Sequence, residues 1–480
     1  VVSTHGGSKV MPQNRLVQPI LLFILVVTSA VTPARADQQR DLSTARAYWL
    51  SADRLAWDVP EDSRVRLHFS REGALQVTDD GLAGGESIRL EPAGRVNGEM
   101  AGRFPHLSGL PVFSIASDQR GLVAGILRGQ FAVSTEGKPA QATGIQPAGA
   151  LDDLYPYDGP LGVTWDAGRP TIRVWAPTAQ SVHLLLFEDS GPAEALARLP
   201  MQRDEASGVW HVRGVPDWDR KFYLFEVKVY ARSTGRIETN RVTDPWSLSL
   251  SMDSRRSQVV NLDDPALAPE GWSGLQKAPL EAPEDIVLYE LHVRDFSRDD
   301  RTVPHDIRGT FAAFALENSA GMQHLGKLAE AGLTHVHLLP AFDCASIPEN
   351  PEQREHPDDL SRHAPDSPEQ QAAIGSIRDR DAFNWCYDPY HYTAPEGSYS
   401  TDPDGVQRII EFRQMVAGLN RLGLRVVMDV VYNHTTGRLQ EAQSVLDRIV
   451  PDYYHRLDSK GDIETSTCCA NTATEHHMME

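Results

Sequence analysis

Apolar residues follow one another with little polar alternation over residues 425–432, and polar side chains interrupt and follow this run. An apolar run of this kind predicts a strand that is buried on both faces, as in the parallel sheet of an α/β protein. Asp429 stands within the run, and Asn433 and His434 come directly after it. Where parallel strands alternate with helices around a barrel, polar groups at the carboxyl end of a strand face the functional mouth. The pattern therefore predicts a functional edge, with a buried strand and a plain polar exit loop as the simpler alternative.

The same kind of strand occurs twice earlier in this half of the chain, and segments with helical spacing of apolar residues lie between the strands. Strands that alternate with helices predict β/α units and a parallel sheet. We therefore expect three strands of one parallel sheet within residues 285–480. The predicted strands are 286–293, 334–339 and 425–432, and the predicted helices are 321–332 and 406–422.

The first half of the chain shows shorter strand-like runs separated by Gly, Asp and Pro clusters, which predict β-rich domains. Residues 37–150 form one such unit. Residues 151–265 form a second unit, whose strand spacing fits an antiparallel sandwich, and residues 266–284 have the Pro and Gly content of a linker. The expected strands are 64–69 and 121–126 in the first unit, and 171–176, 182–187, 208–212 and 222–230 in the second.

Several aromatic residues lie in these β-rich units and have enough flat area to stack on pyranose rings. Those in the second unit fall within strand patterns, so a core position is the simpler expectation for them, and we expect burial for those in the first unit too. The residues concerned are Trp49, Trp57, Trp175, Trp210 and Tyr223.

The first 36 residues have the pattern of an export signal rather than of a folded domain. Met11 is the expected start, Arg15 supplies a short basic region, and the apolar run 20–27 is too short to span a bilayer as a helix. Residues 34–36, Ala-Arg-Ala, match a small-x-small cleavage site. We therefore expect a cleaved signal peptide, a secreted or periplasmic mature protein, and no membrane span after cleavage.

Composition narrows the class of partner. The 480 residues are 41% hydrophobic and 23% charged, which is typical of a globular chain, and their number suggests roughly three domains. The formal net charge of −20 argues against a nucleic-acid backbone or an anionic membrane as the main partner. It suits a soluble protein that acts on a neutral ligand.

The four cysteines are Cys344, Cys386, Cys468 and Cys469, and they lack the spacing of zinc ligands. They are also too few for a disulfide scaffold. In an oxidising compartment the adjacent Cys468 and Cys469 can form a vicinal disulfide, and free thiols are the alternative. Spacing alone leaves their state open.

A segment rich in aromatic and acidic residues, 383–399, precedes the last predicted helix. Loops of this kind on a rigid scaffold are where binding residues concentrate. A sugar needs an exposed aromatic face for its CH-rich ring and a carboxylate for its hydroxyl groups. The segment therefore suits a carbohydrate site, with a structural loop as the alternative. The preceding residues 346–381 contain so many Pro, Asp, Glu and Gln residues that we expect a mobile surface loop.

Three motifs carry a resemblance to glycoside hydrolase family 13. They are Tyr289-Glu-Leu-His-Val-Arg-Asp295-Phe-Ser297, Asn384-Trp385-x-Tyr387-Asp388-Pro389 and Asp429-Val-Val-Tyr-Asn433-His434. The third motif marks the whole family, and the second resembles its type I pullulanase subgroup of debranching enzymes. The resemblance runs from about Ala47 to Glu480.

The resemblance implies a fold and an activity. Residues 285–480 would supply the first three strands of a (β/α)8 TIM barrel, Leu161–Trp272 is similar to a carbohydrate-binding module of family 48, and the preceding β-rich domain resembles the N-terminal domain of pullulanases. The implied activity is hydrolysis of α-1,6-glucosidic bonds by a retaining mechanism with two carboxylates. The implied partners are α-glucans such as pullulan, starch and glycogen-derived dextrins.

The resemblance also implies roles for single residues. Tyr387 would stack on the sugar at subsite −1, and Asp388 would brace that site. His434 would hydrogen-bond the hydroxyl groups of the same sugar. The other implied substrate-binding residues are Trp385, Asp429 and Asn433.

Two departures from the family pattern lie in the aromatic segment. Phe383 stands where the family usually has Tyr, and Cys386 where it usually has Gly. If the glycine serves a turn with positive φ, Cys386 is strained and can displace Tyr387. Asn433 corresponds to a calcium ligand in related amylases, so calcium is a candidate metal, although the resemblance implies no required cofactor.

The bond-breaking carboxylates cannot be assigned in this chain. Retaining glycosidases need a nucleophile and a protonated acid about 5–5.5 Å apart. In the family they follow barrel strands 4 and 5, with a stabilising Asp after strand 7, so we expect all three beyond Glu480. Asp429 keeps a binding role. Because three strands cannot close such a barrel, we expect an incomplete gene product that is inactive by itself.

Two other functions remain as alternatives. Another family 13 enzyme with the same module, such as an isoamylase or a branching enzyme, is disfavoured by the Asn-Trp-x-Tyr-Asp-Pro motif. A non-catalytic α-glucan-binding protein would use the same domains for adhesion. His477-x-x-Glu480 becomes an inverted zinc-protease pattern only if His follows it, and nothing else in the sequence supports a metal site.

Overall fold

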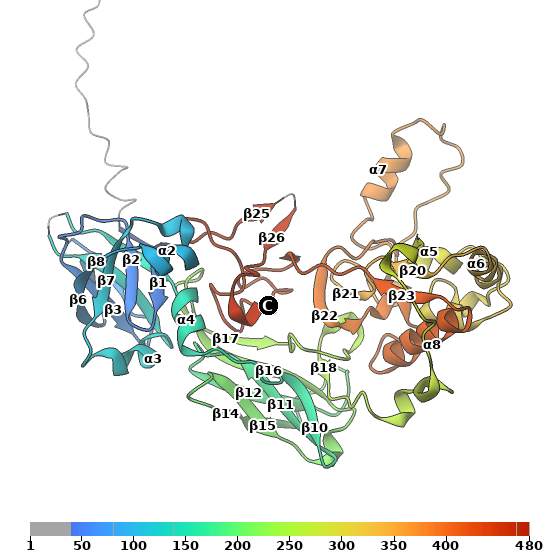
Figure 1. Ribbon diagram of the computed structural model, residues 1–480, viewed down its shortest axis with the longest axis horizontal. Helices are drawn as coiled ribbons and strands as arrows, with labels where there is room; N and C mark the ends of the chain where they lie inside the picture. The colour runs from blue at the N-terminus through green and yellow to red at the C-terminus, as the bar shows by residue number, and fades with distance from the viewer. Residues whose placement is uncertain (1–39, 80, 138, 467, 480) are drawn as a thin grey trace, which may run out of the picture.

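The computed structural model describes residues 40–79, 81–137, 139–466 and 468–479. The predicted signal peptide lies outside these residues, as does Glu480 of the His477-x-x-Glu480 pattern. Among the described residues, no helix combines the length and the apolar character that crossing a bilayer requires. A β-barrel, a two-sheet unit and a parallel sheet lie around the C-terminal segment, which is red in Figure 1.

Alternating apolar residues give the N-terminal part a closed β-barrel. β9 closes it by pairing in parallel with β1, and the other neighbours pair antiparallel. Trp49 and Trp57 are only 1% and 5% exposed, which confirms the expected core position. The order around the barrel is β1 (Arg40–Ser51), β2 (Arg54–Trp57), β7 (Pro111–Ile115), β6 (Glu86–Arg95), β3 (Val65–Ser70), β8 (Gln130–Thr135) and β9 (Ala142–Gln146).

One strand expected in this part is wrong, because residues 121–126 are helical. Val123 and Ile126, three residues apart, are both buried, whereas Leu122 is 46% exposed. That spacing is helical, and the run is too short for periodicity to reveal it. The remaining elements are β4 (Gln76–Thr78), β5 (Gly81–Ala83), α2 (Gly98–Arg103), η1 (Pro105–Leu107), η2 (Arg120–Leu122), α3 (Val123–Ile126) and α4 (Ala148–Leu154).

The second part is an antiparallel sandwich, as its strand spacing predicts. Trp175, Trp210 and Tyr223 are buried in the core that includes this sandwich, so the core position expected for them is also confirmed. One sheet is β10 (Gly162–Asp166), β11 (Arg169–Trp175), β15 (Val209–Arg213) and β14 (Gln202–Arg203). The other is β13 (Ala197–Pro200), β12 (Ser181–Phe187), β16 (Phe222–Ala231) and β17 (Arg236–Val242), with β18 (Ser257–Gln258) on β16. Short turns follow at η3 (Pro216–Trp218), η4 (Met252–Ser254), η5 (Pro265–Leu267), η6 (Trp272–Gly274) and η7 (Pro283–Asp285).

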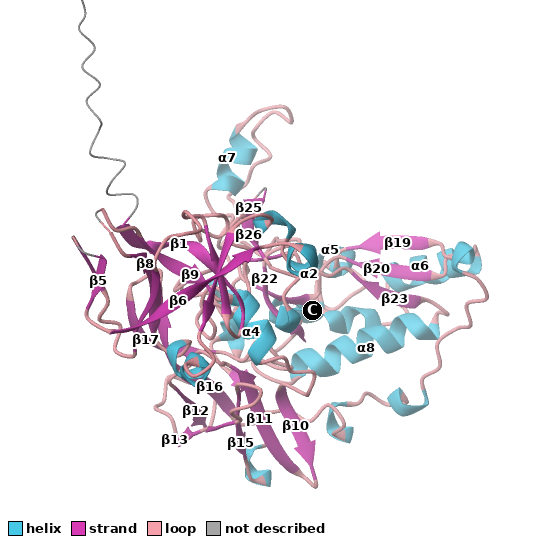
Figure 2. Cartoon of the chain, turned by 60° about the vertical axis from the view of Figure 1, so that its left-hand side comes forward, coloured by secondary structure: helices cyan, strands magenta, loops and turns pink. Residues whose placement is uncertain are grey.

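Three parallel strands form the sheet that the alternation of strands and helices predicts. Its order is β19 (Leu288–Leu291), β20 (His335–Leu338) and β23 (Arg425–Met428). Figure 2 shows α8 running beside these strands. Met415 and Leu419 of α8 and Leu325 of α6 pack into one core with the sheet. The helices are α5 (Val293–Ser297), η8 (His305–Ile307), η9 (Phe311–Ala315), α6 (Ala320–Glu330) and α8 (Gln407–Arg421).

The prediction that residues 425–432 are buried on both faces is wrong. β23 ends at Met428 and lies at an edge of the sheet, where Val427 and Met428 are 38% and 36% exposed. An edge strand has a neighbour on one side only, and the described helices cover only part of its surface. The central strand β20 is the buried one, with Val336 and Leu338 inaccessible.

A long excursion separates β20 from α8. It begins at β21 (Phe342–Cys344) and returns through β22 (Pro389–Pro395), which pair antiparallel. The predicted surface loop contains two short helical segments, and Figures 1 and 2 both show α7 projecting from the rest of the chain. The elements here are η10 (Pro351–Gln353), α7 (Glu369–Gly375) and η11 (Gly397–Tyr399).

The chain after β23 returns across the earlier domains. Tyr453 is fully buried, lies 4.8 Å from Trp175 between ring centroids, and donates to Asp152 Oδ1 at 2.5 Å. Arg232 of the sandwich pairs with Asp452 at 2.8 Å. This segment therefore joins barrel and sandwich into one core. Its elements are β24 (His434–Thr435), β25 (Thr465–Ser466), β26 (Cys469–Asn471) and η12 (His477–Met479).

Candidate functional site

Tyr387 meets the carboxyl end of β23. Its Oη donates to Asp429 Oδ2 at 2.5 Å, and its carbonyl oxygen accepts from His434 Nε2 at 2.7 Å. The His434 Nε2 therefore carries a proton, and its Nδ1 accepts from Asn433 Nδ2 at 3.0 Å. The structure thus brings together four of the predicted site residues, and it fixes the tautomer of the histidine.

Burial and the neighbouring Asp429 raise the pKa of Tyr387 to about 12. The phenol consequently stays protonated at neutral pH and acts as a hydrogen-bond donor to the carboxylate. Its ring is still 38% exposed, and the neighbouring rings of Trp385 and Phe383 are 55% and 47% exposed. Apolar rings that project from a polar edge offer flat faces to a ligand.

Asp388 lies behind this edge rather than on it. Ser346 Oγ donates to its Oδ2, and Asn384 Nδ2 donates to its Oδ1 at 3.2 Å. Burial raises the pKa of this carboxyl. Asp388 therefore ties the aromatic segment to the start of the excursion, which is a bracing position.

The turn before Tyr387 is held by two residues outside the predicted set of site residues, Asn384 and His292. Asn384 Oδ1 accepts from Cys386 N at 2.8 Å, and the Asn384 carbonyl accepts from His292 Nε2 at 2.7 Å. His292 Nδ1 accepts from Asp295 N at 3.2 Å. Burial lowers the pKa of His292, so it stays neutral and keeps these roles. The only sequence signal was the position of His292 within a family motif, near the end of the predicted strand 286–293.

Both cysteine pairs are disulfide-bonded. Cys344 is joined to Cys386, and Cys468 to Cys469, so no described cysteine is free. The sequence alone left this choice open. Cys386 has φ of +59°, so the turn with positive φ expected at this position is present.

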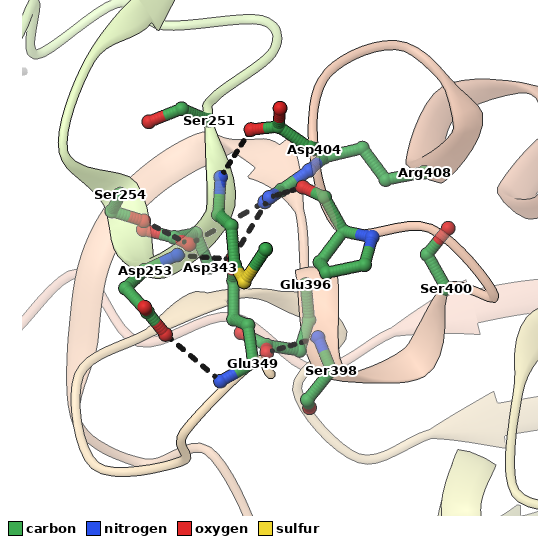
Figure 3. Close-up of polar contacts among 12 residues, drawn as sticks. Ser251, Asp253, Ser254, Asp343, Glu349, Glu396, Ser398, Ser400, Asp404 and Arg408 are labelled. Atoms are coloured by element: carbon green, nitrogen blue, oxygen red, sulfur yellow. Dashed lines mark hydrogen bonds and ion pairs between the residues drawn. The ribbon is translucent and has the colours of Figure 1, made fainter. Parts of the chain in front are cut away.

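A second polar group is buried where the sandwich meets β21 and β22 (Figure 3). Arg408 of α8 is fully buried, donates to Glu349 Oε2 at 3.1 Å, and lies 3.6 Å from Asp343 Oδ1. From the sandwich side, Ser254 Oγ donates to Asp343 at 2.6 Å, and the Asp253 N–H donates to Glu349 at 2.6 Å. These contacts fix the base of the excursion against the sandwich.

Glu396 completes this buried group and connects it to the candidate site. Its Oε2 accepts from the backbone N–H of Cys344 at 2.8 Å. Burial, together with the charges of Glu349 and Asp343, raises the pKa of Glu396. The three carboxylates offer oxygens within 4.8 Å of one another. The Arg408 guanidinium already supplies the positive charge beside two of them, so we read the group as a structural junction.

Comparison with protein-family models gives two matches. Residues 44–153 match the Pullulanase N2 domain, and residues 160–247 match carbohydrate-binding module 48, the isoamylase N-terminal domain. In a comparison of the full sequence, the chain is 41% identical over 448 residues to pullulanase 1 of Arabidopsis thaliana, a chloroplast protein. The alignment covers 91% of this chain. The chain is a relative of the pullulanases.

Bacterial pullulanases agree with this relationship. The pullulanase of Klebsiella pneumoniae is 36% identical over 95% of this chain, and that of Bacillus subtilis is 30% identical over 69%. The alignments cover 46% of the Arabidopsis and Klebsiella proteins and 40% of the Bacillus protein. The chain therefore spans about half the length of the curated relatives it matches.

Solved pullulanase structures share the fold. The apo pullulanase of Klebsiella pneumoniae has a TM-score of 0.85 at 36% identity and covers 91% of this chain and 52% of its own. A maltotriose complex of the same enzyme has a TM-score of 0.86 over 93% and 53%. The resemblance to pullulanases, the β-rich N-terminal domains and the family 48 module are thus confirmed. The roles of single site residues stay predictions.

Proposed function

We propose that this chain binds α-glucans at the edge formed by Tyr387, Asp429 and His434, and that it is part of an α-1,6-glucan debranching hydrolase. The observation that carries the proposal is the hydrogen-bonded Tyr387, whose ring stays exposed while Asp429 and His434 hold it. A ring fixed in this way loses little freedom when a sugar stacks on it. The pullulanase relatives, one of them solved with maltotriose, support the class of ligand.

The proposed activity belongs to a polypeptide with more of the barrel than the three strands described. We propose that β19, β20 and β23 are the first three strands of a (β/α)8 barrel. Its remaining strands would cover the exposed residues of β23. Hydrolysis would use a carboxylate nucleophile and an acid from those strands, in a retaining mechanism. Tyr387 and His434 would position the glucose unit next to the scissile bond.

A calcium ion at Asn433 finds little support in the described residues. Calcium takes six to eight oxygen ligands, whereas the recorded contacts of Asn433 are the His434 ring nitrogen and a backbone N–H from Thr472. We therefore propose no role for calcium in the reaction.

We further propose that the mature protein is exported, on the strength of the signal-like residues 1–36. Expression with and without these residues, followed by fractionation of the cells, tests this. Retention of the full chain in the cytoplasm would contradict export.

Binding is tested by electrophoresis of the 480-residue chain through gels with and without pullulan. We expect the parent chain to be retarded and the variant Tyr387→Ala to migrate as in a pullulan-free gel, because the stacking face is gone. Tyr289→Ala, which removes a comparably exposed ring from β19, is the matched control and should remain retarded. Equal retardation of the parent and Tyr387→Ala would refute the proposed site.

Hydrolysis is tested separately, with a reducing-sugar assay on pullulan. We expect the 480-residue chain to release nothing, and a longer version carrying an Asp and a Glu on later strands to release maltotriose. Two alternatives give different results. A non-catalytic glucan-binding protein would stay inactive in the longer version, and an isoamylase or branching enzyme would favour glycogen or amylose over pullulan.

A further inference from the structure

The residue directly before Tyr387 has a backbone conformation that favours glycine. Cys386 has φ of +59°, in the left-handed region where a side chain with a Cβ atom is uncommon. Tyr387 takes its direction from this residue, because the peptide that follows Cys386 carries its backbone. A change of residue 386 to a right-handed conformation would swing Tyr387 away from Asp429 and His434.

The side chain of Cys386 forms a disulfide bond that opposes this change. It is fully buried and bonded to Cys344, with Cα atoms 5.3 Å apart, within the usual range for a disulfide. Its Sγ also lies 3.6 Å from Tyr399 Oη. On the backbone side, its N–H donates to Asn384 Oδ1 at 2.8 Å.

Cys344, the other cysteine of this disulfide, is held in place by its own contacts. It ends β21, pairs with Pro389 across the sheet, and is 5% exposed. Its N–H donates to Glu396 Oε2 at 2.8 Å, which links it to the buried junction with Arg408 and the sandwich. The disulfide therefore connects the turn before Tyr387 to the buried group of Asp343, Glu349, Glu396 and Arg408.

We propose that the Cys344–Cys386 disulfide is a positioning device for Tyr387, which holds residue 386 in its left-handed conformation and makes glucan binding depend on the redox state of this pair. The inference rests on the proposed glucan-binding function. Reduction by a dithiol transfers two electrons and two protons to the disulfide, giving two cysteine thiols and the oxidised cyclic form of the dithiol. Residue 386 is then free to leave the left-handed region.

Two variants distinguish the effect of losing the disulfide from the effect of having a Cβ atom at residue 386. Cys344→Ser removes the disulfide and leaves a residue with a Cβ at 386. Cys344→Ser combined with Cys386→Gly also removes the disulfide but lets residue 386 adopt positive φ at no steric cost. We expect the Kd for maltotriose, measured by calorimetry, to rise about tenfold in the first variant, since a residue held in a disfavoured conformation relaxes, and to return to within about twofold of the parent in the second.

Treatment with a reductant tests the proposal independently. Dithiothreitol should weaken maltotriose binding by the parent chain to the level of Cys344→Ser. The double variant keeps the Cys468–Cys469 pair, so any effect of reductant that remains in it belongs to that second disulfide. Peptide mapping of the parent under non-reducing conditions should recover Cys344 joined to Cys386.

A readout without sugar keeps this inference distinct from the proposed function. Hydrogen exchange at residues 385–388 should speed up in Cys344→Ser and slow again in the double variant, because the Cys386 N–H loses and regains its bond to Asn384. If the parent does not bind maltotriose, the proposed function fails and this exchange pattern still decides the positioning role. Unchanged exchange and binding in Cys344→Ser, or free thiols at both positions in the parent, would overturn it.

Discussion

The hydrogen bond from Tyr387 to Asp429 is a contact whose removal leaves the aromatic face in place. Tyr387→Phe keeps the ring and loses the donor, so we expect weaker maltotriose binding through a less constrained ring. A hydrogen bond to a charged group contributes about 1.5–3 kcal/mol, and partial exposure of the ring lowers that, so the Kd should rise about three- to tenfold. Calorimetry measures the change.

The matched control is Tyr157→Phe, which removes a phenol that donates to a nearby carbonyl on the protein surface. It should leave the Kd unchanged. A Tyr387→Phe variant that binds maltotriose as tightly as the parent would mean that Asp429 does not orient the ring.

For single residues, the motifs predict which residues form the site better than they predict the contacts that those residues make. Tyr387, Asp429 and His434 come together as expected, because each lies at the end of a strand or in the segment that packs there. His292 was missed because its role is a bond to the backbone of Asn384, 92 residues away, which leaves no local pattern. The disulfide of Cys386 was undecided because spacing does not report distance in space.

At the level of secondary-structure elements, strands β3 and β8 of the barrel bury His68, which makes the stability of the fold depend on pH. Burial, with a smaller contribution from the Arg66 charge, lowers the pKa of His68 to about 4 from 6.5. As the pH falls, the unfolded chain takes up this proton first, so the contribution of His68 to stability is complete above pH 6.5 and is lost toward about pH 4.

The variant His68→Gln should therefore show a smaller fall in the free energy of unfolding over this interval than the parent. Urea unfolding at several pH values measures the difference. His106→Gln, which removes an exposed histidine, is the control and should follow the parent curve. Parallel curves for the parent and His68→Gln would contradict the assignment.

The junction of β21, α8 and the sandwich makes the stability of the fold depend on pH in the opposite direction. Burial raises the pKa of Glu349 above 4.5. As the pH rises from this value, the unfolded chain releases the proton first, so the stability of the folded state is lost with increasing pH. Glu349→Gln keeps an oxygen that can accept from Asp253 N–H and carries no charge.

We expect the free energy of unfolding of Glu349→Gln to fall less between pH 4.5 and neutrality than that of the parent. Glu352→Gln removes an exposed carboxylate three residues further on and serves as the control. The same steep fall in the parent and in Glu349→Gln would exclude Glu349 as its source.

Long periodic segments predict the elements well, and short ones do not. α6 and α8 and the sandwich strands lie within a few residues of the expected ranges. The helical residues 121–126 were mistaken for a strand because six residues hold too little periodicity. The burial of β23 was overestimated because an apolar run does not say whether a strand has one neighbour or two.

On the scale of the whole molecule, the segment after β23 joins parts that are distant in sequence. Tyr453 contacts Trp175 of the sandwich and Asp152 of α4. No local pattern predicts such contacts, so the order of the domains could be predicted from the sequence and the contacts that hold them together could not. Tyr453→Ala should lower the free energy of unfolding by about 3–5 kcal/mol, as for other buried aromatic side chains.

Urea unfolding followed by tryptophan fluorescence measures this loss. Tyr432→Ala removes a ring that is 52% exposed, and its effect should be much smaller. Equal losses in the two variants would show that the C-terminal segment does not stabilise the assembly of barrel and sandwich.

The covalent bond between Cys344 and Cys386, 42 residues apart in the chain, encloses the protruding part of the excursion, with α7. Exposed tips of this kind are where proteases cut. A single cut there would divide the polypeptide into two pieces that still migrate as one on a gel and separate only after a thiol is added. Nicked protein would therefore pass for intact protein in any preparation examined without reductant.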